Sequence, residues 1–363
     1  MAYSQSESSQ PHVVGSRDPG TYRASHAALP SPDARAKSKG QFNRRVAFVG
    51  AVATAAWTAL AAIVGIWPNY DDFPETSTLA WLSVVLAAVL FFATISGSRR
   101  HAEALADARI GAITRVFPWA IALAVVLSGW EVVTAKLGLL PRPFFAPPQA
   151  LLDVFRNDYI KLGTSLLYSL RLLFLGYVAG AMTGFVVGVG VGWSRIVGYW
   201  VHPILRIIGP LPATAWLPLA FFFFPSSFSA SIFLIALASG FPVAVLTWSG
   251  VASVNPAFYD IARTLGGKPW FLVLRVAVPA ALPSVFVGLF MGLGASFSVL
   301  VVAEMMGVKA GLGFYLQWAQ GWAAYANMYA ALLVMALMCS GLITLLFAVR
   351  GRLLVWQKGL LKW

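Results

Sequence analysis

Few residues of this sequence have the types and spacing that chemistry requires, and none of them forms a catalytic set. Gly267-Lys268 resembles the end of a phosphate-binding loop, but Ala262 replaces the first glycine of that loop and Pro269 replaces its Ser or Thr. The single cysteine, Cys339, excludes an intrachain disulfide and a cysteine metal cluster. No two histidines have the helical spacing of metal ligands; they are His12, His26, His101 and His202. The sequence therefore predicts no enzyme activity, no metal site and no nucleotide site on this chain.

Two carboxylates in or beside apolar segments are the remaining candidates, because ionisable groups are costly in such surroundings and often functional. Glu131 precedes Lys136 by five residues, which is not one helical turn, so we expect Glu131 to be solvated at an interface rather than paired. For Glu304, beside Met305 and Met306, two hypotheses stay open. It shapes an external mouth or a docking surface for a soluble receptor, or it is an interfacial charge that reaches water.

The elements that must position these residues are predicted to be membrane-spanning helices. Of the 363 residues, 59% are hydrophobic and only 11% are charged, against about 25% charged in an ordinary soluble domain. Apolar segments near the roughly 20 residues that cross a bilayer recur along the chain. They lie at 46–66, 78–97, 116–138, 165–193, 200–224, 229–251, 280–303 and 327–350. The sequence thus predicts an all-α polytopic membrane protein with about eight transmembrane helices, and it excludes soluble, secreted and fibrous classes.

The charges between these segments predict their orientation. Residues 1–45 are polar and basic, and we expect them to form a disordered cytoplasmic tail. The next loop holds Asp71, Asp72 and Glu75 without a basic residue, so it lies outside. Alternation then places 252–279 and the basic C-terminus inside. The net charge of +13 is therefore interpreted as a topology signal rather than a nucleic-acid patch, with both termini cytoplasmic.

Glycines at four-residue spacing mark one face of the fourth segment. They are Gly176, Gly180, Gly184, Gly188 and Gly192. A ridge without side chains lets another helix approach closely in lipid. Two interpretations remain: ordinary helix packing, and a surface that also slides when the protein changes conformation.

The segment 254–283 is the most informative stretch outside the predicted spans. Asn255 is suited as an N-cap with Pro256 at the first helical position, and a Gly-Gly pair ends that helix. Pro269 opens a second helix. We predict two short cytoplasmic helices over 255–272.

One face of the first short helix is suited to contact with another protein. Asp260 and Arg263 are spaced for pairing, which leaves Tyr259, Ala262 and Gly266 on a small contact surface. Insertion into a groove on a cytoplasmic partner is one hypothesis. The alternative is a solvated loop on the membrane surface.

Several motifs in order make the chain resemble the inner-membrane subunits of binding-protein-dependent ABC importers. The run from Asp260 to Gly266 resembles the EAA signature, with Asp in place of Glu. The resemblance is closest to the nitrate, taurine and aliphatic-sulfonate permease branch, and it runs from about Trp130 to Arg352. The other matching motifs are Trp130-Glu131, Ser169-Leu170-Arg171, Pro210-Leu211-Pro212 with Trp216-Leu217-Pro218-Leu219, and Ala303-Glu304-Met305 with Gly311-Leu312-Gly313.

The resemblance implies a fold, a location and a set of partners. It implies a six-helix type I importer core over 101–363, two extra transmembrane helices over 46–100, and the bacterial cytoplasmic membrane. The implied partners are two ABC ATPase subunits that carry ATP and Mg, a soluble substrate-binding protein, and a second permease copy, by default in a homodimer. Neither a cofactor on this chain nor nucleic acid is implied.

The resemblance also assigns roles to residues. The ATPase-coupling residues would be Tyr259, Asp260, Ala262, Arg263, Gly266 and Gly267. A place in the pathway or at its outer mouth is suggested for Pro210, Pro212, Trp216 and Glu304.

The implied function is ATP-driven import of a small anion such as a sulfonate, taurine or nitrate. The run Phe221–Phe224 also admits an aromatic or other apolar organic anion. A rival is a secondary transporter that needs no ATPase, but it should carry an internal repeat, and we find no convincing one. A second rival is a non-transporting scaffold that recruits a cytoplasmic protein through 255–272.

Overall fold

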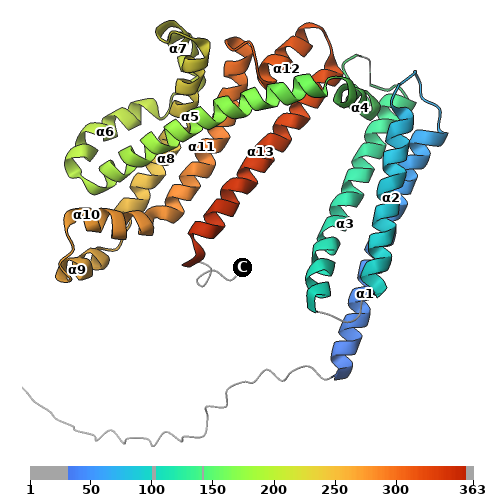
Figure 1. Cartoon of the computed structure of the whole chain (residues 1–363), viewed down its shortest axis with the longest axis horizontal. Helices are drawn as coiled ribbons and strands as arrows, with labels where there is room; N and C mark the ends of the chain where they lie inside the picture. The colour runs from blue at the N-terminus through green and yellow to red at the C-terminus, as the bar shows by residue number, and fades with distance from the viewer. Residues whose placement is uncertain (1–31, 100–103, 141–142, 357–363) are drawn as a thin grey trace, which may run out of the picture. The chain divides into compact units, whose positions relative to one another are not determined.

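The computed structural model describes the backbone of residues 32–99, 104–140 and 143–356, and the side chains of 47–96, 116–140 and 143–356. Regular structure in these ranges is helical (Figure 1). The long helices are α1 (Pro32–Ile66), α2 (Thr76–Arg99), α3 (Ala104–Glu131), α5 (Tyr159–Trp193), α8 (Ser227–Ala252), α11 (Val278–Met306) and α13 (Tyr325–Leu353). The shorter helices are α4 (Pro148–Asn157), α6 (Arg195–Ile208), α7 (Leu217–Phe223), α9 (Pro256–Thr264), α10 (Pro269–Phe271) and α12 (Leu312–Gly321). Wider π-helical turns lie at Val132–Lys136 and Leu272–Ala277, and a tighter 3-10 turn lies at Ala213–Trp216.

The described residues contain seven helices that are long and apolar enough to cross a membrane, or eight if one bent pair counts as a span. Helices suit a lipid environment because their backbone groups pair within the segment. The predicted all-α polytopic membrane fold is confirmed.

The predicted fifth span, 200–224, is not one continuous helix. Its two parts, Arg195–Ile208 and Ala213–Phe223, meet at an angle of 88°. The break falls at Pro210-Leu211-Pro212, where each proline lacks a backbone N–H and disfavours helical geometry in the residue before it. The prediction of one span relied on the mean hydropathy of the whole segment, and this mean does not reveal the bend.

The expectation of a disordered tail over residues 1–45 is wrong for residues 32–45. Helix α1 begins at Pro32, and residues 32–45 continue into the first span as helix. Residues 1–31 of the expected tail lie outside the described residues.

Contacts divide the chain into two compact units, one of residues up to 55 with 88–121 and one of 56–87 with 122 onwards. In the second unit, α5, α8 and α11 pack side by side (Figure 1). Their contact buries a core that includes Leu172, Leu234, Ile235 and Leu300. All the sites described below belong to this second unit.

Candidate functional site

Helix α9 is bounded by the capping residues that its sequence predicts. The Asn255 side-chain oxygen accepts a hydrogen bond from the Ala257 N–H at 3.0 Å. At the other end, Gly266 has a φ of +82°, a conformation that glycine adopts without a Cβ penalty. The Gly266 and Gly267 N–H groups bond the carbonyls of Arg263 and Ala262, both at 2.9 Å, in the pattern of a Schellman cap. The helix is therefore fixed in length by local chemistry.

The second predicted short helix is continuous with the next span. Pro269 opens it at the first helical position, as expected. It then runs through the π-helical turn Leu272–Ala277 into α11. The whole stretch Pro269–Met306 is long and apolar enough to cross a membrane as one span. Pro279 and Pro283 do not end it, because Pro279 lies in the first turn of α11 and Pro283 is accommodated inside the helix.

The two faces of α9 have different surroundings. Tyr259 turns toward the bundle, where its ring lies 5.7 Å from that of Trp193 at the end of α5. Burial raises the pKa of Tyr259. Asp260 and Arg263 form the expected ion pair at 3.2 Å, with both side chains exposed. The expectation that Tyr259 shares a surface with Ala262 and Gly266 is wrong, since it anchors α9 to the bundle.

The outer face of α9 forms a concave apolar surface, and the hollow that it lines has a volume of about 530 Å³. Ala262, Gly266 and Gly267 lie in its lining. The walls are exposed apolar side chains that sequence reasoning missed: Phe258, Ile261, Leu265, Trp270 and Phe271. The signal was available, because Phe258, Ile261 and Leu265 recur at helical spacing in a segment outside the predicted spans.

The carboxylate of Glu304 is buried where three of the motifs meet. The Ser169 hydroxyl donates to it, with its oxygen at 2.7 and 2.9 Å from the two carboxylate oxygens, and the Gly313 N–H donates at 2.7 Å. Ser169 in turn accepts the Leu312 N–H at 2.8 Å. Glu304 thus accepts the Gly313 N–H directly, and Ser169 accepts the Leu312 N–H, at the start of α12, where the helix dipole favours a negative charge.

The interfacial interpretation of Glu304 is wrong, because the residue is only 1% exposed. It lies beneath α12 rather than at the surface. The other suggested pathway residues lie at the bend of α6 and α7, where Pro210 and Pro212 are exposed and Trp216 packs against the core.

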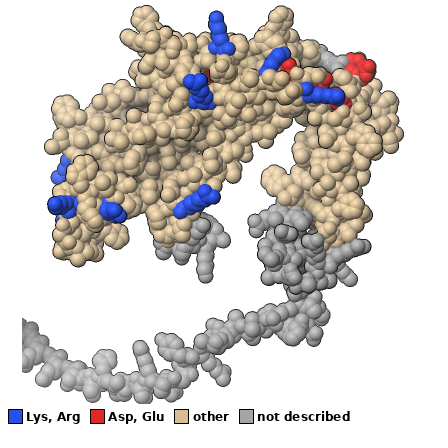
Figure 2. Space-filling view, in the orientation of Figure 1, with Lys and Arg blue, Asp and Glu red and all other residues tan. Residues whose placement is uncertain are grey.

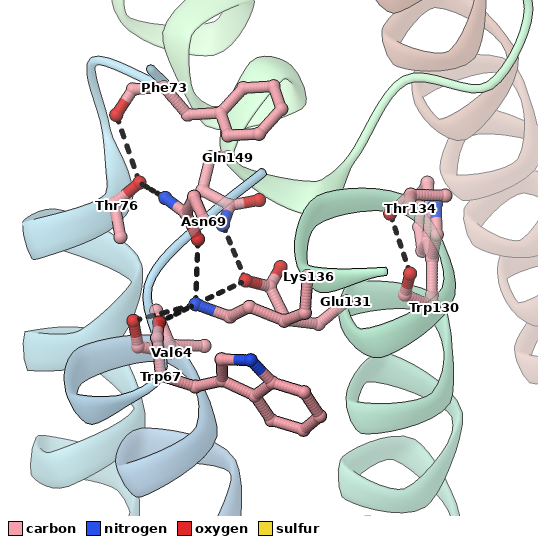
Figure 3. Close-up of polar contacts among 10 residues, drawn as sticks. All are labelled: Val64, Trp67, Asn69, Phe73, Thr76, Trp130, Glu131, Thr134, Lys136 and Gln149. Carbon is pink, nitrogen blue, oxygen red and sulfur yellow. Dashed lines mark hydrogen bonds and ion pairs between the residues drawn. The ribbon is translucent and has the colours of Figure 1, made fainter. Parts of the chain in front are cut away.

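Glu131 and Lys136 form a buried ion pair, which corrects the expectation that Glu131 is solvated (Figure 3). The π-helical turn from Val132 to Lys136 brings residues five apart onto one face. The Lys136 ammonium lies 3.6 Å from the carboxylate, and neither side chain is exposed. The Gln149 amide of α4 donates to Glu131 at 2.6 Å.

The three N–H donors of Lys136 have three acceptors besides the carboxylate (Figure 3). These are the Val64 carbonyl at 3.1 Å, the Trp67 carbonyl at 2.6 Å and the Asn69 side-chain oxygen at 2.6 Å. A nitrogen that donates three times is an ammonium. Lys136 therefore caps the C-terminal end of α1, and Glu131 neutralises its charge.

The glycine ridge of α5 lies against α8. A Cβ added at Gly176 would come within 2.6 Å of Ile235, and one at Gly192 within 2.7 Å of Val251. At Gly180, Gly184 and Gly188 the added atom would meet the backbone of α8. The missing side chains are what allow the two helices to approach this closely.

The described residues contain no group of three His, Cys, Asp or Glu side chains placed to hold a metal ion. What the arrangement offers is a membrane bundle with an exposed, concave apolar surface at one end and buried polar contacts that fix its helices.

Comparison with known proteins agrees with this architecture. Residues 176–354 match the family described as binding-protein-dependent transport system inner membrane component. A "Probable ABC transporter permease protein" of Brucella abortus (strain 2308) is 31% identical over 239 residues, which are 66% of this chain and 94% of that protein.

Two further relatives carry names that state a cargo. The taurine transport system permease protein of Escherichia coli (strain K12) is 34% identical, covering 65% of this chain and 88% of its own. A Bacillus subtilis (strain 168) permease protein named for aliphatic sulfonates transport is 30% identical, covering 66% and 85%. The chain therefore belongs to the family of binding-protein-dependent transport system inner membrane components.

Proposed function

We propose that this chain is the transmembrane subunit of an ATP-driven importer of a small anion, a sulfonate, taurine or a nitrate-like ion. The names of the Escherichia coli and Bacillus subtilis relatives support this class of cargo. ATP and Mg belong to separate ATPase subunits, and this chain supplies the pathway through the membrane. A soluble binding protein delivers the cargo.

The end of the bundle that carries α9 is cytoplasmic in this proposal. Asp260 is the only acid near that end among the described residues. The basic side chains there are Arg195, Arg263, Lys268, Arg275, Arg350 and Arg352. In the face drawn in Figure 2, blue but no red side chains are visible at the end that carries α9 and α10. Asp71, Asp72, Glu75, Asp153 and Asp158 belong to loops and short elements of the opposite end. Excess Lys and Arg on one side is the usual signal of the cytoplasmic face.

The concave apolar surface of α9 is the observation that carries the proposal. Exposed Phe258, Ile261 and Leu265 have no function in a solvated loop, and they suit a groove on a cytoplasmic protein. Movement of α9 passes to the bundle by two routes. Tyr259 contacts the end of α5, and the helix that opens at Pro269 continues into α11.

Two copies of this chain would enclose the pathway, each with one α9 bound to one ATPase subunit. Closure of the ATPase pair on ATP moves the α9 segments together and changes which side of the membrane the pathway faces. A nucleotide drives this change only through its different affinity for the two states. The homodimer is the simplest closed assembly.

The test is a pair of aspartate substitutions on one helix. Ile261→Asp places a charge inside the concave surface, whereas Ala257→Asp places it on the exposed first turn, where the helix dipole favours it. Co-purification with the ATPase and ATP-dependent uptake into proteoliposomes should fall at least tenfold for Ile261→Asp and stay unchanged for Ala257→Asp.

Two further variants probe the cap and the exposed ion pair. Gly266→Pro is incompatible with the φ of +82°, and Asp260→Lys reverses the charge beside Arg263. Both should insert into the membrane normally and lose coupling. Normal ATPase binding and normal uptake by Ile261→Asp and Gly266→Pro would overturn the proposed coupling role.

A further inference from the structure

Arg171 is a cation inside a membrane-spanning helix without an acidic partner. It lies in α5, about 18 Å along the helix from Tyr159 at 1.5 Å per residue. Its guanidinium carbon lies 5.4 Å from the centre of the Phe228 ring, and among the described residues no carboxylate pairs with it. A charge at such a place is costly and usually marks a functional site.

A crevice of about 500 Å³ lies beside Arg171, between α5, α11 and α13. Phe174 and Tyr177 of α5, Leu293 of α11 and Leu346 of α13 are among its walls. The Tyr177 hydroxyl is already used, since it donates to the Leu289 carbonyl at 2.8 Å. The crevice is therefore apolar apart from Arg171, and its volume lies within the range of small-molecule sites.

This combination selects for one kind of occupant. An acid group pairs with Arg171, and an apolar body replaces lipid or water against the leucine and aromatic walls. Taurine carries an ammonium group, and no carboxylate lines the crevice to receive it. Nitrate has no apolar body and would leave the walls unfilled.

We propose that this crevice binds an organic anion with an apolar body, of the alkyl- or arylsulfonate class, and that Arg171 pairs with its acid group. The inference rests on the proposed function, and it narrows the cargo from small anions in general to apolar sulfonates. A free anion is favoured over an anionic lipid because a crevice of about 500 Å³ has the size of a small-molecule site.

Binding of radiolabelled 1-hexanesulfonate to the assembled permease–ATPase complex, in nanodiscs of phosphatidylcholine, tests this site. Arg171→Gln keeps most of the side-chain stem and removes the charge, and Arg206→Gln removes a second exposed charge outside the crevice. We expect at least a tenfold loss of affinity for Arg171→Gln and no change for Arg206→Gln. Taurine and nitrate should not compete with the labelled ligand.

A second pair of variants tests the crevice itself without touching the charge. Leu346→Trp fills the space, whereas Leu333→Trp enlarges an exposed position of the same helix outside it. Only Leu346→Trp should lower the affinity for 1-hexanesulfonate. Equal affinity of the wild type, Arg171→Gln and Leu346→Trp would overturn the site.

Two measurements separate this inference from the proposed function. Displacement of bound 1-hexanesulfonate by phosphatidylglycerol added to the nanodiscs would assign the crevice to lipid and overturn the inference. ATP-dependent uptake of taurine by a complex that never binds 1-hexanesulfonate would overturn it as well, while the importer function stands. Specific binding that Arg171→Gln abolishes, in a complex that transports no anion with ATP, would support the site and contradict the importer.

Discussion

Glu131 and Lys136 lie five residues apart, and a π-helical turn brings their charged groups to 3.6 Å in a site closed to solvent. The pair also joins distant parts of the chain, because Lys136 binds the carbonyls of Val64 in the last turn of α1 and of Trp67 just after it. The Tyr70 N–H adds a bond of 2.8 Å to the Ala135 carbonyl, inside the same turn. This contact ties the end of α1 to the end of the third span.

Removing the lysine should destabilise the protein far more than removing an exposed one. Lys136→Met leaves Glu131 charged without its partner and three acceptors without a donor, at a cost of about 3–5 kcal/mol. Lys161→Met is the matched control, because the Lys161–Asp158 pair has an exposed lysine and should cost at most about 1 kcal/mol. Thermal unfolding in nanodiscs compares them. Equal stability of the two variants would contradict the role of Lys136.

Exchanging the two charges should fail to restore stability. In Glu131→Lys/Lys136→Glu the carboxylate would face the Val64 and Trp67 carbonyls, which need a donor. The double variant should therefore unfold at least as easily as Lys136→Met. A wild-type unfolding temperature would mean that the pair acts by charge alone and that the helix cap contributes nothing.

Local chemistry made some of this structure predictable from sequence. The spans follow from long apolar runs, and both ends of α9 follow from Asn255 and Gly266, whose capping roles need no distant partner. The bend at Pro210-Leu211-Pro212 was also present in the residues, but it was masked by hydropathy averaged over the segment. Structural features that depend on a few neighbouring residues can be predicted directly from the sequence.

Long-range contacts could not be predicted in the same way. Ser169 and Glu304 are 135 residues apart, and only the packing of α5, α11 and α12 brings them together. Nothing in the spacing of Glu131 and Lys136 indicates a π-helical turn, because an ordinary α-helix would separate them around its axis. The Arg171 crevice needs three helices from distant segments, so the tripeptide that contains Arg171 carries no sign of it.

The glycine at the start of α12 should tolerate no side chain. Gly311 has a φ of +106°, and a Cβ there would collide with the Glu304 carboxylate. Gly311→Ala should cost several kcal/mol, since it combines backbone strain with disruption of a buried hydrogen-bonded carboxylate, roughly 1–3 kcal/mol for each cause. Gly321→Ala, at the other end of the same helix with open space around it, is the control. Unfolding temperatures of the two variants should differ clearly, and equal values would show that α12 moves away from Glu304 at little cost.

The effect of replacing a glycine of α5 by alanine should depend on its position along the helix. Gly184→Ala forces the added carbon against the backbone of Gly240 in α8, and such overpacking costs about 1–3 kcal/mol. Gly163→Ala lies on the same helix with nothing near it, so it should be neutral or stabilising by up to about 1 kcal/mol. If Gly184→Ala retains full stability but slows uptake, the ridge is a sliding surface. Loss of stability alone would assign it to packing.

Lowering the pH should weaken the contacts by which Asp158, at the end of α4, holds α12 and α13. The Lys161 ammonium at 2.8 Å is the main cause that lowers the pKa of Asp158, with further hydrogen bonds from the Tyr315 hydroxyl at 3.1 Å and the Asn327 amide at 2.9 Å. Burial raises the pKa of Tyr315 to about 12, so this phenol remains a donor over the whole relevant range.

The sign of the effect follows from the lowered pKa. Ionised Asp158 stabilises the folded state above its unfolded pKa of about 4, and this stabilisation is lost as the pH falls through the lower folded pKa. Thermal unfolding between pH 7 and pH 3 should therefore show a loss of stability in the wild type that is smaller in Asp158→Asn. The pKa of Glu75 is lowered too, chiefly by the Thr78 hydroxyl, so the difference between the two curves, rather than either curve, isolates Asp158. Parallel curves would mean that Asp158 is protonated at the same pH in both states and that its three partners do not hold its charge.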